Sequence, residues 1–144
     1  MDKILNILTV FVYLILGIVC LKMAFKSIFS KKYLPFHEEA TDKQWDKIEE
    51  RLQYLILALL RISGLGFFIV FLILTVLPVI NYFKPDPFIR YFVPGISFIF
   101  CLGLFIFNFL LFKQTKAKTP WIGSLMVMII IIMNFMLSMH SVFS

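Results

Sequence analysis

The stretch ISGLGFFIVFLILTVLPVINYF, residues 62–83, contains 22 residues and no charged side chain. A helix of about 20 apolar residues, rising about 1.5 Å per residue, crosses the roughly 30 Å hydrocarbon core of a bilayer. Three more uncharged runs, of 18, 22 and 26 residues, lie at residues 4–21, 91–112 and 119–144. The sequence therefore predicts an all-α integral membrane protein with four spans.

The composition agrees with this prediction. Hydrophobic residues make up 61% of the 144 residues and charged residues 15%, against about 25% charged residues in soluble domains. Because four spans use most of the chain, we expect a single transmembrane domain covering residues 1–144. We place the four spans at about residues 4–25, 54–80, 89–112 and 120–142. The cytoplasmic segment is expected at about residues 26–53.

The basic residues predict the orientation. Ten Lys and Arg residues flank the links after spans one and three, whereas three lie on the opposite side, with Arg61 left out of the count. Basic residues are more frequent on the cytoplasmic side, so both termini are expected outside the cytoplasm. The net charge of +6 is then explained by anionic lipid head groups, and no nucleic-acid partner is expected.

The short links predict that consecutive helices are antiparallel neighbours, which gives an up-down four-helix bundle. Thr41 and Gln44 have the spacing of a capping box. Apolar residues then recur at helical spacing, so we expect one helix from about Asp42 to Ile80 that extends into the cytoplasm. Its charged outer face is either simply solvated or a docking surface for a partner anchored by Trp45.

Polar side chains near the cytoplasmic ends of the spans form the candidate site. Arg61 either extends to lipid phosphate at the interface or lines a small basic pocket suited to a lipid phosphate or a carboxylate. Gly64 and Gly66 would allow a neighbour or ligand to approach. The residues of this predicted ligand-binding pocket, one from each span, are Lys22, Arg61, Asn108 and Ser124.

The other polar residues of the spans have structural explanations. Asn134 and Tyr13 fall near the middle of spans four and one, and an interhelical hydrogen bond is the preferred interpretation. Cys20 and Cys101 differ in depth, so we expect two small buried apolar side chains and no disulfide.

Several classes of function lack their usual residues. No Asp or Glu lies inside a predicted span, which disfavours proton-coupled exporters and isomerases that need a buried carboxylate. His37, with Glu38 and Glu39, lacks the ligand number and spacing of a metal site. No nucleophile has a base beside it, and no phosphate-binding glycine loop is present. We therefore expect no metal and no cofactor, and an enzyme is the least favoured of the three classes of function.

The segments Tyr33-Leu-Pro-Phe-His37, Arg61-Ile-Ser-Gly64 and Thr119-Pro-Trp121, with Trp45 and Gln53 between them, occur in this order. In this respect the chain resembles a group of small, functionally uncharacterised bacterial membrane proteins with four transmembrane helices, and more distantly the DoxX-like proteins. The resemblance implies a four-helix bundle in a bacterial cytoplasmic (inner) membrane. The chain departs from the group where further glycines are usual, at Leu65, Phe67 and Phe68.

Two functions follow as hypotheses. The first is a non-catalytic integral membrane protein that binds lipids, anionic ones included, or serves as an accessory subunit of a membrane complex or homo-oligomer. Its expected partner-facing residues are His37, Trp45 and Trp121. The alternative is an oligomeric small-molecule carrier or channel, because a single bundle this apolar offers no aqueous path.

Overall fold

The computed structural model describes the backbone of residues 2–143 and the side chains of residues 4–137 and 139. The described part of the chain is 86% helical, which confirms the all-α prediction. In chain order the elements are α1 (Asp2–Ile28), α2 (Pro35–Thr41), a 3₁₀ turn (Trp45–Lys47), α3 (Glu50–Phe83), α4 (Pro87–Thr115) and α5 (Trp121–Phe143).

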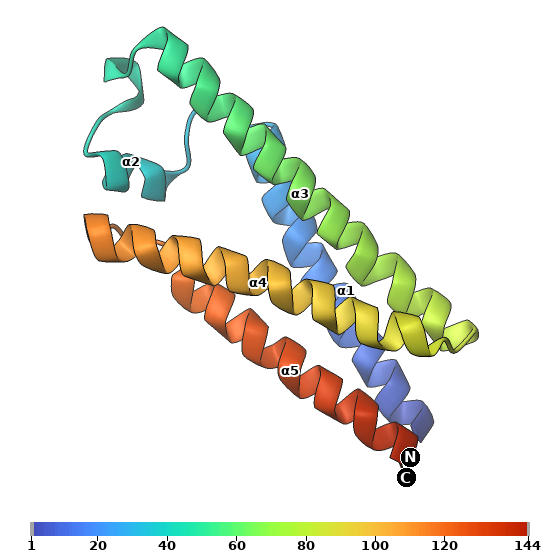
Figure 1. The fold of residues 1–144 in the computed structure, drawn as a ribbon. Coiled ribbons are helices and arrows are strands. Elements are labelled where there is room, and N and C mark those ends of the chain that lie inside the picture. Colours follow the sequence, from blue (N-terminus) through green and yellow to red (C-terminus); the bar gives the residue numbers. More distant parts are fainter. Residues whose placement is uncertain (1, 144) are drawn as a thin grey trace.

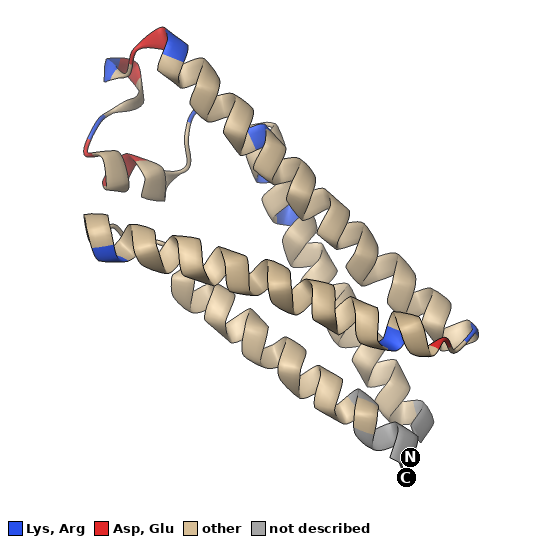
Figure 2. Cartoon of the chain, in the orientation of Figure 1, with Lys and Arg blue, Asp and Glu red and all other residues tan. Residues whose placement is uncertain are grey.

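Three helices are long and apolar enough to cross a membrane, within Ile4–Ile28, Glu50–Phe83 and Pro87–Thr115. The fourth long helix, α5, is apolar over Trp121–Leu137, the part with all side chains described. Large hydrophobic side chains are exposed along all four helices, while the acidic residues coloured in Figure 2 lie outside them or at their ends. Such surfaces are favourable in hydrocarbon and unfavourable in water, and they support a membrane protein.

The long helices associate in two pairs, α1 with α3 and α4 with α5. Two glycines allow α1 and α3 to approach closely. A methyl group at Gly17 would lie 2.7 Å from the Thr75 side chain. A methyl group at Gly64 would lie 2.7 Å from the Ile28 side chain and 3.1 Å from the Ala24 carbonyl oxygen. Small residues at such crossings are typical of helix contacts in membranes.

The α4–α5 pair is held by aromatic contacts. The indole of Trp121 packs against three phenylalanine rings of α4, with centroid distances of 5.7 to 6.3 Å, namely Phe105, Phe109 and Phe112. The two pairs meet near residues 83–87 and diverge toward the end that carries α2 (Figure 1). The residues that form the shared core are Tyr13, Leu16, Val70, Leu74, Val93, Cys101 and Ile131.

The predicted start of the second long helix was wrong: α3 begins at Glu50 and not at Asp42. The Thr41–Gln44 capping box does not form, because Thr41 ends α2 and its hydroxyl donates back to the His37 carbonyl at 2.9 Å. Asp42 adopts a left-handed conformation with φ of 50°, which terminates α2. Local helical spacing is therefore overridden by the contacts of the segment between α1 and α3.

That segment is organised around Tyr33, which is only 3% exposed. Its ring meets Trp45 edge-on with centroids 5.0 Å apart, and its hydroxyl donates to the Lys43 carbonyl. The Gln53 amide donates to the Trp45 and Ile48 carbonyls at 2.8 and 3.0 Å. These bonds satisfy backbone acceptors in the turn that precedes α3, so the chain turns there where helical spacing alone predicts a continuous helix.

Candidate functional site

Two residues of the predicted basic pocket, Lys22 and Arg61, lie at different heights along the paired helices α1 and α3. Gly64 faces Ile28 and Ala24, which fixes the register of α3 against α1. Arg61 lies three residues before Gly64, beyond the end of α1, whereas Lys22 lies six residues before Ile28, toward the middle of α1. At 1.5 Å per residue the two positions differ by roughly 8–13 Å along the helix axes, counted from Ala24 or from Ile28. Both side chains are exposed.

The other two residues of this pocket bond to their own surroundings. The Asn108 amide donates to the Leu104 carbonyl at 2.8 Å, and the Ser124 hydroxyl donates to the Pro120 carbonyl at 3.3 Å. Each bond reaches the carbonyl four residues earlier in the chain, a common way for polar side chains to be satisfied in a helix. Among the described residues no hydrogen bond joins any two of the four, so a shared pocket stays a prediction.

His37 has a local structural task at the start of α2. Its Nδ1 accepts a hydrogen bond from the Leu34 backbone N–H at 3.2 Å. Burial lowers the pKa of His37 below its usual 6.5, since a buried site disfavours the charged imidazolium. At neutral pH the ring is therefore neutral and can accept this bond, which satisfies one of the amides near the start of α2.

A contact between distant segments attaches α2 to the opposite helix pair. The Glu39 carboxylate accepts a hydrogen bond from the Lys118 backbone N–H at 3.0 Å. Next to it, the Thr119 hydroxyl donates to the Asn108 carbonyl at 2.8 Å and closes the link between α4 and α5. The segment between α1 and α3 thus reaches across the divergent ends of the two pairs.

Trp45 offers a first prediction. We expect Trp45→Ala to loosen the segment between α1 and α3, because the indole packs on Tyr33, while the helix pairs stay folded. Limited proteolysis should then cut within residues 29–49 faster than in the wild type, with an unchanged melting temperature in detergent. Phe29→Ala, which removes a 70% exposed ring, is the control. Loss of the whole fold in Trp45→Ala would contradict the prediction.

A second polar region lies where α1, α3 and α4 meet, at the end opposite α2. Asn134 is 2% exposed, and its amide donates to the Thr9 carbonyl at 3.3 Å. This bond between α5 and α1 agrees with the predicted interhelical role of Asn134, and its side chain also interacts with that of Tyr13. Within the described part of the chain, the buried Thr9 Oγ1 and Asn134 Oδ1 have no hydrogen-bond partner.

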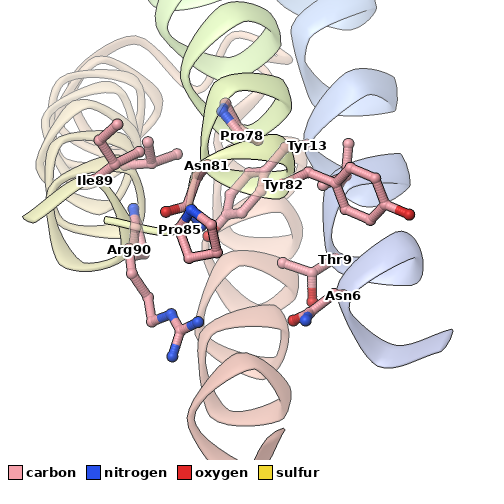
Figure 3. Close-up of a pocket in the computed structure, with 12 residues that line it drawn as sticks. Asn6, Thr9, Tyr13, Pro78, Asn81, Tyr82, Pro85, Ile89 and Arg90 are labelled. Carbon is pink, nitrogen blue, oxygen red and sulfur yellow. The ribbon is translucent and has the colours of Figure 1, made fainter. Parts of the chain in front are cut away.

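Beside these residues is a cavity of about 60 Å³. Figure 3 shows Asn6 and Thr9 of α1 on one side, Arg90 of α4 on the other, and Asn81 and Tyr82 of α3 between them. The remaining lining residues are Val10, Tyr13, Pro78, Pro85, Ile89, Val93 and Pro94.

This cavity was not predicted from the sequence. Arg90 entered only the count of basic residues, and Asn6, Asn81 and Tyr82 had no assigned role. One signal was present: polar residues occur near the ends of the first two apolar runs and beside the stiff Lys-Pro-Asp-Pro link at residues 84–87. These polar residues can be grouped into one site only when the register of α1 against α3 and α4 is known.

No protein family, curated protein or solved structure matches the chain.

Proposed function

We propose that the chain is a four-span protein of a bacterial cytoplasmic membrane, an up-down bundle of α1, α3, α4 and α5 with both termini outside the cytoplasm. The exposed apolar side chains of the four helices support the spans, and the ten basic residues at the two links on the α2 side support the orientation. The resemblance to small bacterial four-helix membrane proteins, distantly DoxX-like, is part of the same proposal.

Within this frame the best-supported function is non-catalytic lipid binding at the cytoplasmic side. The divergence of the two helix pairs toward α2 carries this proposal (Figure 1). Over residues 102–115 α4 buries no side chain, although its preceding half buries Val93, Pro94, Ser97 and Cys101. In a bilayer the apolar faces that diverge must be covered by acyl chains or by another apolar helix.

Charge favours lipid over a partner helix as the covering group. Arg61 and Lys22 are exposed on the α1–α3 pair, and the segment after α1 adds further lysines. Anionic head groups are attracted to basic residues at this depth. The two basic side chains lie at different levels, so they would contact separate phosphates or the head group and glycerol region of one lipid.

Arg61 provides the test, because arginine grips phosphate with two parallel hydrogen bonds whereas lysine offers a point charge. We expect Arg61→Lys to retain less phosphatidylglycerol than the wild type in native mass spectrometry from mild detergent. Arg51→Lys, the same change at an exposed position of α3, is the matched control and should retain as much as the wild type. Equal retention in all three proteins would show that Arg61 is an interface anchor only.

An accessory role in a membrane complex belongs to the same first proposal, and the alternative function is an oligomeric carrier or channel for a small molecule. In the same native mass spectrometry experiment, a carrier or channel should appear as a homo-oligomer without bound lipid. An accessory subunit should appear with a co-purifying membrane protein. His37, Trp45 and Trp121 remain proposed interface residues for such a partner. Since all three also make contacts inside the chain, a partner would meet their remaining exposed edges.

A further inference from the structure

The cavity between α1, α3 and α4 has an unusual balance of charge for a site within apolar helices. Its twelve lining residues include one basic residue, Arg90, and no acidic residue. Arg90 is half-buried, so its charge is partly removed from water. A positive charge in such a place is stabilised by an anion or by several hydrogen-bond acceptors.

The polar groups around Arg90 are suited to a ligand that accepts hydrogen bonds. Asn81 uses its Oδ1 to accept the Asp86 backbone N–H at 2.8 Å, which leaves its amide N–H groups available to donate. Thr9 is one of the residues that line the cavity, and its buried hydroxyl has no hydrogen-bond partner among the described residues. A guanidinium, an amide and a hydroxyl together form a donor set for an oxyanion.

The link beside the cavity is braced by hydrogen bonds, and prolines line the cavity from three parts of the chain: in α3, in α4 and in the link. Pro78 and Pro94 lie inside α3 and α4, and Pro85 lies in the link between them. The link is braced at both ends, because Asn81 accepts from the Asp86 N–H and the Asp86 carboxylate caps the Phe88 N–H at 2.7 Å. A site built on fixed helix ends loses little entropy when it binds a ligand.

The size of the cavity limits the ligand. A water molecule needs roughly 10–15 Å³ of cavity volume, so the cavity of about 60 Å³ accommodates a group of a few heavy atoms. A carboxylate or a phosphate group fits this limit, whereas a whole lipid or nucleotide does not. A larger molecule could place only its anionic group in the site.

We propose that this cavity is a binding site for one small oxyanion, a carboxylate or phosphate group, held by Arg90 with Asn81 and Thr9. The site is separate from the lipid-binding region proposed near α2 and does not depend on it. The proposed topology determines only the side from which the anion enters, which is the side outside the cytoplasm. The anion is either free in solution or part of a lipid head group.

The test uses the full-length protein in mild detergent with two probes. Inorganic phosphate, titrated at constant ionic strength, should raise the melting temperature of the wild type in a saturable manner if the ligand is a free anion. Retention of one phosphatidylglycerol per chain, compared with phosphatidylcholine, should appear instead if the ligand is a head group. Arg90→Gln should weaken the response about tenfold or more, since a hydrogen bond to a charged group is lost.

Lys84→Gln is the matched control, because Lys84 is exposed, lies in the same link and does not line the cavity. It should bind as the wild type does. Thr9→Val keeps the side-chain shape and should weaken binding without loss of fold, which covers the case in which Arg90→Gln fails to fold. The proposal is overturned if neither probe binds, or if Arg90→Gln or Thr9→Val binds as well as the wild type. It is also overturned if Lys84→Gln weakens binding as much as Arg90→Gln does.

Discussion

Gly64→Ala is expected to destabilise the protein by about 1–3 kcal/mol, the usual cost of overpacking a closely packed contact. The added methyl group would lie 2.7 Å from Ile28 Cγ1, 3.0 Å from the Ile28 nitrogen and 3.1 Å from the Ala24 carbonyl oxygen. Two of these atoms belong to the backbone of α1 and cannot move aside as a side chain can. The α1–α3 pair must therefore separate, and thermal unfolding in detergent should show a lower melting temperature.

Gly66→Ala is a closely matched control, two residues farther along α3. A methyl group there meets nothing within 4 Å, and alanine favours a helix over glycine by about 0.8–1.0 kcal/mol in water. Its melting temperature should be unchanged or slightly higher. If both variants lost stability equally, the two glycines would act through helix flexibility, and the close approach of α1 to α3 at Gly64 would be disproved.

This contrast shows what could be predicted from the sequence. Gly64 and Gly66 look alike in the chain, and both were expected to admit a neighbour or a ligand. The structure separates them, because Gly64 faces Ala24 and Ile28 while Gly66 faces open space. Which face of a helix meets a neighbour depends on the packing of all four helices, and hydropathy along one run does not contain that information.

The helices themselves were predictable because the signal is local. Long uncharged runs appear as α1, α3, α4 and α5, and Pro120 precedes α5 as expected for a proline at a helix start. The start of α3 was not predictable from spacing, because it depends on Gln53 bonding the carbonyls of Trp45 and Ile48. Helical periodicity continues through the segment before α3, but the contact of the Gln53 side chain stabilises a turn there in place of a helix.

The candidate sites follow the same rule. Lys22 and Arg61 each lie near the cytoplasmic end of a predicted span, but their levels differ once Gly64 is set against Ile28. Arg90 and Thr9 are 81 residues apart in the sequence, yet both line one cavity. Polar residues near helix ends are easily found in a sequence, whereas their grouping into a site depends on helix register.

Cysteine labelling should give an all-or-none result for the proposed topology. In a background with Cys20→Ala and Cys101→Ala, single cysteines at Ser30 and Gln114 should not react with an impermeant maleimide in intact cells. A cysteine at Lys84 should react, because it lies on the link between α3 and α4, at the other end of both helices. All three should react after the membrane is permeabilised, which controls for local accessibility. A cysteine at Ser144, outside the described residues, tests the fourth span in the same way.

The reverse pattern would invert the orientation and change both functional proposals. The link at residues 84–86 and the cavity beside Arg90 would then face the cytoplasm, where its anion would come from the cytosol or the inner leaflet. The basic residues around Arg61 would face outward, against the usual excess of Lys and Arg on the cytoplasmic side. The cavity would keep its donor set in either orientation, since that depends on helix packing alone. The lipid proposal near α2 would keep the divergence of the helix pairs but lose its preference for anionic lipid, because that preference rests on the charge of the cytoplasmic leaflet.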